Sequence, residues 1–112
     1  MVYDERLAAR VRRVLGDVPG VSERKMFGGV CFLINGNMAC GPVRDFLMIR
    51  AGPQEYEQVL AEGPARPMTF TGRPMRGIVE VEAAALKDDD VLDEWVQRGV
   101  DFASSLPPKR KA

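Results

Sequence analysis

The stretch KMFGGVCFLINGNMACG, residues Lys25–Gly41, decides the fold because a turn signal lies between two dense apolar runs. Asn35-Gly36 joins the run VCFLI to the run NMACGPV. A type I′ turn needs positive φ at both central residues, and Asn followed by Gly adopts that conformation at low cost. We therefore predict a β-hairpin with a two-residue turn at Asn35-Gly36 and one strand on either side.

The predicted turn also sets which residues face each other. Counting outward places Ile34 opposite Asn37 and Cys31 directly opposite Cys40, on the same face of the sheet. Such a pair is non-hydrogen-bonded, with Cα atoms about 4.5 Å apart, at the lower edge of the disulfide range. We predict a packed, reduced thiol pair, because an unpaired cysteine behaves as a small buried hydrophobe. A redox-switched dithiol is the alternative, and it requires exposed thiols with a lowered pKa.

Gly28-Gly29, in the same stretch, raises the question of a phosphate loop. That loop needs a strand, a glycine-rich turn and then the amino terminus of a helix, with Lys followed by Ser or Thr in its commonest form. Here the two glycines lead into another apolar strand, VCFLI. We interpret Gly28-Gly29 as a tight connection between two strands.

Outward from this stretch, helical and strand-like patterns alternate with Gly and Pro breaks. Residues 3–15 carry apolar residues at helical spacing among arginines and predict a helix. Four short apolar runs predict an antiparallel meander of four strands at residues 21–27, 30–34, 37–43 and 45–51. The remaining expectations are a helix over 53–63, a Gly, Pro and Arg-rich loop at 64–76 with one short strand over 68–71, a strand over 78–82, and a long helix that begins at Asp88–Asp90 and ends at Leu106.

These elements predict a single α+β domain. A chain of 112 residues is long enough to bury one hydrophobic core and too short for several. The amino-terminal, middle and long carboxy-terminal helices are expected to pack on an antiparallel sheet that contains the meander and one or two further strands. The domain is predicted to span residues 1–106, with residues 107–112 as a basic flexible tail.

Composition restricts the chemistry that the chain supports. The sequence contains no histidine, which removes Ser-His and Cys-His nucleophile pairs and any imidazole base. Two cysteines are too few for a four-thiolate zinc site. Glu80 and Glu82 lie two apart on an alternating strand, where such carboxylates normally face water. We expect no enzymatic activity, no catalytic residues, no bound metal and no cofactor.

The charge balance and the amino terminus bear on location. The 16 basic and 16 acidic residues cancel, so no global field draws the chain to nucleic acid or to an anionic membrane. No apolar run approaches the roughly 20 residues that a membrane span needs, and MVYDERLAARVRR has no apolar signal core. We expect a cytoplasmic protein without a membrane partner, in a compartment where thiols are kept reduced.

Two long stretches resemble a known family. RKMFGGVCFLINGNMACGPVRDFLMIRAG and the downstream GRPMRGIVEVEAAALKDDDVLDEWVQRG look like the amino-terminal domain of the TfoX/Sxy family, named for regulators of natural competence. The resemblance implies a curved antiparallel sheet with helices packed on it, a transcription-linked regulatory role and no catalytic residues. Better-known members append a second helical domain, and this sequence is similar to the stand-alone versions. The most specific pieces are Met26-Phe27-Gly28-Gly29, the Asn35-Gly36 turn, the Leu47–Arg50 strand, the Met75–Val81 strand entry and the Asp-rich helix start with Trp95.

Two hypotheses of function follow. The first is a non-catalytic regulatory module that acts by protein contact, because the central hairpin has apolar side chains on both faces and a layer of helices covers one. The second face is then covered by a partner protein, by a second copy in a homodimer, or by the long last helix. The alternative is binding of an anion or nucleic acid by Arg66, Arg73 and Arg76 of the loop, aided by the basic tail residues Lys109–Lys111.

Overall fold

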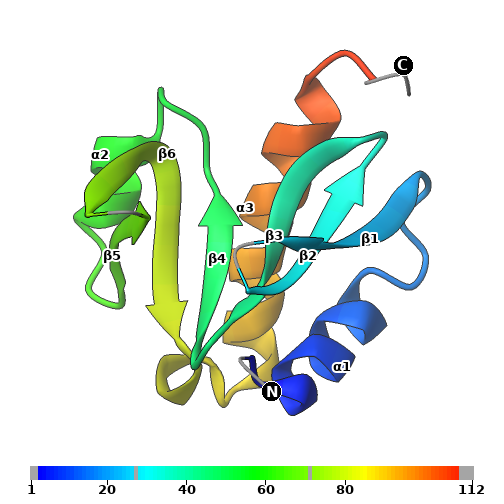
Figure 1. The fold of residues 1–112 in the computed structure, drawn as a ribbon, viewed down its shortest axis with the longest axis horizontal. Helices are drawn as coiled ribbons and strands as arrows, with labels where there is room; N and C mark the ends of the chain where they lie inside the picture. The colour runs from blue at the N-terminus through cyan, green and yellow to red at the C-terminus, as the bar shows by residue number, and fades with distance from the viewer. Residues whose placement is uncertain (1–2, 27, 71, 109–112) are drawn as a thin grey trace.

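Six strands form one antiparallel sheet, in the order β1-β2-β3-β4-β6-β5 (Figure 1). The computed structural model describes residues 3–26, 28–70 and 72–108. The first four strands form the predicted meander, and β5 and β6 extend it on the β4 side. The bounds are β1 Val21–Met26, β2 Gly29–Ile34, β3 Asn37–Val43, β4 Phe46–Arg50, β5 Ala65–Phe70 and β6 Arg73–Glu82. Phe27 and Thr71, which the sequence placed in strands, lie outside the described residues.

The helices cover one face of this sheet, which confirms the α+β class. They are α1 (Glu5–Val14), α2 (Tyr56–Leu60) and α3 (Asp89–Ser105), with a short 3-10 turn η1 (Ala83–Leu86) before α3. Figure 1 shows α3 running behind the central strands. Apolar side chains from all three helices share one buried cluster with one side of the sheet. Within the part of the chain described, no helix is both long enough and apolar enough to span a membrane.

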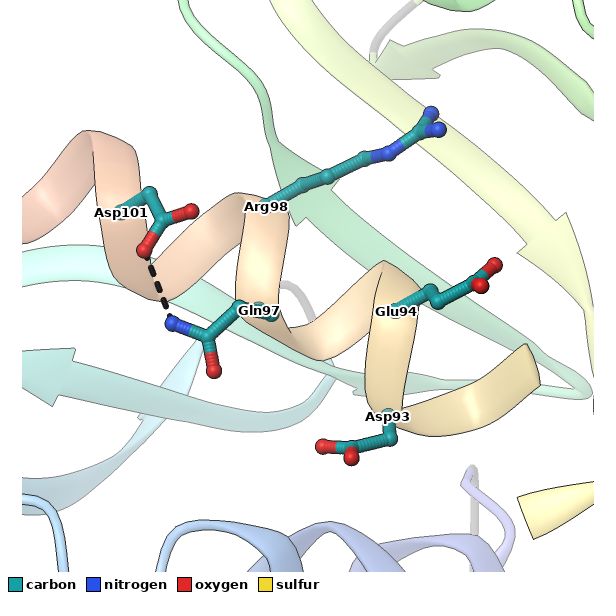
Figure 2. Close-up of a pocket in the computed structure, with 5 residues that line it drawn as sticks. All are labelled: Asp93, Glu94, Gln97, Arg98 and Asp101. Carbon is teal, nitrogen blue, oxygen red and sulfur yellow. Dashed lines mark hydrogen bonds between the residues drawn. The ribbon is translucent and has the colours of Figure 1, made fainter. Parts of the chain in front are cut away.

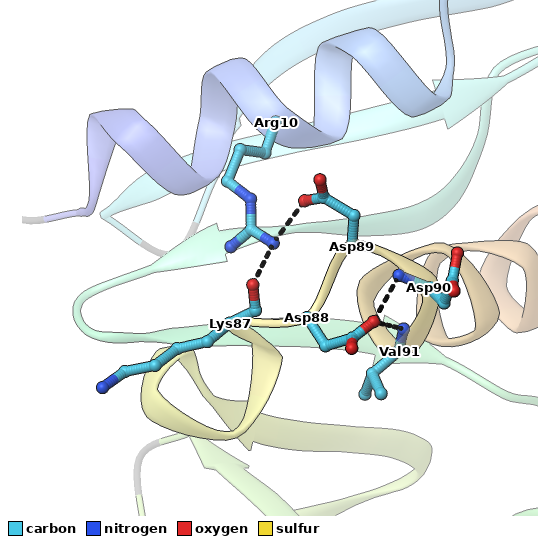
Figure 3. Close-up of polar contacts among 6 residues, drawn as sticks. All are labelled: Arg10, Lys87, Asp88, Asp89, Asp90 and Val91. Atoms are coloured by element: carbon cyan, nitrogen blue, oxygen red, sulfur yellow. Dashed lines mark hydrogen bonds and ion pairs between the residues drawn. The ribbon is translucent and has the colours of Figure 1, made fainter.

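Aspartates cap the starts of the two longer helices, and an arginine of α1 joins α1 to the start of α3. Asp88 accepts hydrogen bonds from two backbone N–H groups in the first turn of α3, as the run of aspartates predicted. Arg10 of α1 donates to the Asp89 carboxylate at 2.9 Å and to the Lys87 carbonyl at 3.3 Å (Figure 3). The start of α3 is thereby fixed against α1.

A β-bulge in β3 corrects the predicted pairing of the two cysteines. Ile34 pairs with Asn37 as expected, but Phe32 pairs with Cys40, because the register shifts by one residue after the first two pairs. The prediction that Cys31 lies directly opposite Cys40 on the same face is therefore wrong. Cys40 joins the cluster under the helices, whereas Cys31 joins a second buried cluster on the other face.

The bulge lies at a close contact between α3 and the sheet. A Cβ built at Gly99 of α3 would lie 2.4 Å from the carbonyl oxygen of Ala39 and 3.4 Å from the Cβ of Cys40. The helix therefore rests on the bulged backbone itself, and only glycine leaves room for this contact. An extra residue in one strand bends that strand and increases the local twist of the sheet.

The segment predicted as an Arg-rich loop is a hairpin. β5 runs over Ala65–Phe70, longer than the expected strand at 68–71, and β6 begins at Arg73 rather than near residue 78. Pro67 misled the sequence interpretation, because proline is unsuited to central strands. β5 is an edge strand, where a missing N–H donor is tolerated, and its register shifts next to this proline.

The carboxy-terminal segment is attached to the central hairpin. The side-chain amide of Asn37, a buried residue with 2% exposure, donates to the Pro107 carbonyl at 3.0 Å. The chain is thus fixed at least as far as Pro107, one residue into the predicted flexible tail. The basic tail residues Lys109–Lys111 lie outside the described residues.

Candidate functional site

The predicted turn residues have structural roles. Asn35 and Gly36 have φ of 52° and 83°, which confirms the type I′ turn. Gly28 lies between the antiparallel strands β1 and β2, and Gly29 is the first residue of β2, so the interpretation as a tight strand connection is also confirmed. A Cβ at Gly29 would lie 2.2 Å from the Pro42 carbonyl oxygen, which means that strand packing requires this glycine.

The two thiols are buried and unbonded. Cys31 has 1% exposure and Cys40 has none, and both are free cysteines. Burial raises the pKa of Cys31 to about 12, and burial together with the nearby Cys31 thiol raises the pKa of Cys40 as well. A reactive dithiol needs exposure and a lowered pKa, so both thiols have the opposite of the properties that the redox alternative requires.

The three arginines of the predicted binding loop do not come together as one site. Arg66 of β5 donates to the carboxylates of Glu80 and Glu82 on β6, at 2.8 Å for Glu82, and these hydrogen bonds raise the Arg66 pKa. Arg73 is exposed at the start of β6. Arg76 lines a groove on the face of the sheet opposite the helices.

We call that side of the sheet the open face; its buried cluster consists of strand residues alone. The cluster contains Cys31, Val43, Phe46, Met48, Met68 and Ile78. Met48 on the central strand β4 is fully buried there without any helix above it. The curved sheet therefore covers the middle of its own open face. Three partly buried methionines, Met26, Met38 and Met75, pack at the border of this cluster.

A groove of about 400 Å³ lies on the open face beside this cluster, and we call it the basic groove. Apolar side chains and arginines line it together. Its end is formed by the Gly52-Pro53 corner and by Phe102 of α3. The apolar lining residues are Met26, Leu33, Met38 and Ile78, and the basic ones are Arg24, Arg50 and Arg76.

Strand register explains how arginines from distant strands reach one groove. Arg24 of β1 pairs with Cys31, and Arg50 of β4 pairs with Ile78, so both arginines share the open face with these partners. The Arg50 guanidinium carbon lies 5.1 Å from the centre of the Phe102 ring, a cation–π contact that orients it. Arg24 and Arg50 were not identified as site residues from the sequence alone. The alternation of side chains along their strands would have placed both on the same face as Cys31 and Met48.

The basic groove has an excess of positive charge. Its lining contains three arginines and no carboxylate among the residues that the structure describes. The ion pairs found in those residues involve Arg10, Arg12, Arg66 and Arg98, and none involves a groove arginine. The arginines of the basic groove are therefore available to an anionic ligand, whereas Arg66 is not.

A second hollow lies on the outer face of α3 and differs in kind. Its lining is polar and largely acidic: Asp93, Glu94, Gln97, Arg98 and Asp101. Figure 2 shows Asp93 and Glu94 pointing away from each other, while the Gln97 amide donates to Asp101 at 2.8 Å. Arg98 extends to Glu62 at 2.8 Å. We interpret this hollow as the solvated surface of α3.

The fold and the groove define a small α+β domain with a helix layer on one face of its sheet and a basic, methionine-bordered groove on the other. The family model described as the TfoX N-terminal domain matches residues 13–103. The chain therefore belongs to the TfoX N-terminal domain family, as the sequence resemblance indicated. No curated protein and no solved structure matches the chain.

Proposed function

We propose that this domain is a non-catalytic regulatory module that acts by binding another protein through the open face of its sheet. The observation that carries the proposal is the basic groove, which combines an apolar lining with arginines that form no ion pair within the described part of the chain. Membership of the TfoX N-terminal domain family supports a transcription-linked role. In this proposal the domain works in the cytoplasm and affects transcription through protein contact.

The chemistry of the remaining surface supports the same proposal. The sequence has no histidine, and the adjacent carboxylates Glu80 and Glu82 are bound to Arg66. Direct nucleic-acid binding is the second candidate, and Arg73 and Arg76 favour it. The pairing of Arg66 weakens that candidate, because a guanidinium held by two carboxylates offers little charge to a phosphate.

Affinity capture from native cytoplasm, with and without nuclease, tests the proposal. The immobilised chain should retain one or a few proteins in stoichiometric amount, and nuclease treatment should leave them bound. Capture that disappears with nuclease, or that yields nucleic acid alone, would refute protein contact and support the second candidate.

We also expect self-association as a homodimer, and light scattering that shows only monomer at high protein concentration would contradict it.

A further inference from the structure

We propose that the basic groove binds a short, extended peptide segment of the partner that carries acidic side chains beside at least one apolar side chain. This inference rests on the proposed function and names the chemistry of its partner. Its evidence is that, among the residues the structure describes, the groove is lined by three arginines and apolar side chains and by no carboxylate.

The curvature of the sheet determines the length of segment that the groove accepts. Arg24 lies on β1 and Arg76 on β6, four strands away in the sheet order. A flat sheet would separate these strands by about 19 Å, yet the curved sheet brings both arginines to one groove. An extended peptide rises about 3.3 Å per residue, so at most about six residues lie between the two arginines.

The arginines supply recognition of acidic groups. Each guanidinium forms a planar fork that matches a carboxylate, and the three forks come from three different strands. Arg50 is half-buried and already stacked on Phe102, so it loses little freedom when it pairs with a carboxylate. Arg24 and Arg76 are exposed and line the groove from two different strands, β1 and β6.

The apolar lining supplies the second part of the recognition. Met26 and Met38 are partly buried, and Leu33 and Ile78 lie beneath them with exposures of 8% and 7%. Methionine side chains are unbranched and adapt to differently shaped apolar groups. A phosphodiester backbone has no apolar group to place on this lining, which favours a peptide over nucleic acid.

The geometry also disfavours a second copy of the chain as the occupant. The acidic residues of α3, such as Asp93 and Asp101, would complement the arginines of the groove. However, α3 lies behind the sheet (Figure 1), whereas the groove, apart from Phe102 at its end, is lined by strand and loop residues on the open face. Docking α3 of one copy into the groove of the next is a head-to-tail contact, which forms an open chain of molecules rather than a closed dimer.

Fluorescence anisotropy with the whole protein and a fluorescein-labelled peptide of sequence DEFDELDDF tests the inference. Two matched peptides separate the contributions: NQFNQLNNF removes the charge, and DESDESDDS removes the apolar side chains. The Arg24→Glu/Arg76→Glu variant should bind DEFDELDDF at least about tenfold more weakly, because two favourable pairs become repulsive. Arg13→Glu, an equal charge change per site on the exposed surface of α1, should stay within about twofold of the parent.

Each result either supports or overturns the inference. Weak binding of both matched peptides, together with the selective loss in the groove variant, supports it, and a circular dichroism melt shows that the variant is folded. Equal binding of NQFNQLNNF, or an equal loss in Arg13→Glu, overturns it. Duplex DNA that displaces the peptide at lower concentration overturns it in favour of nucleic acid, and concentration-dependent chain growth in sedimentation overturns it in favour of a second copy.

The same variants separate this inference from the proposed function. If the parent and the groove variant capture the same partner equally from cytoplasm, the groove inference is wrong and the proposed function stands. If the parent captures no protein but binds DEFDELDDF selectively, the proposed function is wrong and the chemistry of the groove stands.

Discussion

Replacing Gly99 of α3 by alanine should destabilise the fold, although alanine is the better helix former. The new Cβ would lie 2.4 Å from the carbonyl oxygen of Ala39 and 3.0 Å from its carbonyl carbon. Ordinary carbon–oxygen contacts are no closer than about 3.3 Å, so the helix must retreat by about 1 Å. The opposing group is bulged backbone, which cannot rotate away as a side chain can.

The size of the effect follows from two opposing terms. Overpacking of this kind costs about 1–3 kcal/mol, and the rigid backbone partner places Gly99→Ala at the upper end. Helix propensity returns about 1 kcal/mol, because glycine is the poorer helix former. The net expectation is a loss of about 2 kcal/mol, equivalent to a melting temperature roughly 8 °C lower for a domain of this size.

Differential scanning calorimetry and urea unfolding both measure this change. Gly63→Ala is the matched control, because a Cβ at Gly63 meets nothing within 4 Å, and its stability should change by no more than about 0.5 kcal/mol. If Gly99→Ala melts at or above the temperature of the parent, the close contact between α3 and the bulge is wrong.

Gly36→Val should lower stability by at least about 1 kcal/mol, because φ of 83° is strained for a β-branched residue, and an unchanged urea midpoint would count against the turn. A thiol reagent at neutral pH should leave native Cys31 and Cys40 unmodified and react with both after denaturation, whereas immediate reaction of either would contradict its burial and raised pKa. Hydrogen bonds from Arg12 lower the pKa of Glu23 in the folded protein below its ordinary value of 4.5. The pair therefore stabilises the fold above pH 4.5, and this stabilisation is lost as the pH falls through the lower pKa of the folded state. Glu23→Gln should remove this pH-dependent contribution to the free energy of unfolding, which is less than about 1 kcal/mol because the pair is solvent-exposed. An acid-unfolding profile identical to that of the parent would contradict this prediction.

Features that depend on local backbone chemistry were predictable from the sequence. The dihedral preference of Asn35-Gly36 is intrinsic to those two residues, and it specified the hairpin, its turn type and its first two pairs. Asp88 likewise caps α3 through its own side chain and the next backbone N–H groups. Such features require no knowledge of what lies across the fold.

Features that depend on distant contacts were not predictable in the same way. The bulge in β3 lies against a helix that comes about sixty residues later in the chain, and counting residues outward from the turn gives no information about that contact. From the sequence alone, Pro67 disfavoured a strand, and only the sheet order shows that its strand, β5, lies at an edge where proline is tolerated. The basic groove was not predicted, because Arg24 and Arg76 line the same groove only as a result of the curvature of the whole sheet.

Because the two cysteines lie on opposite faces of the sheet, their labelling rates measure the opening of each face separately. A buried thiol is labelled only while the structure above it is open, so its labelling rate measures that opening event. Cys40 lies under α3 and reports when the helix layer lifts, whereas Cys31 lies in the strand-only cluster and reports when the curved sheet relaxes. Labelling rates at the two sites that diverge in mild denaturant would mean that the layers open independently, and equal rates would mean that the domain opens as one unit.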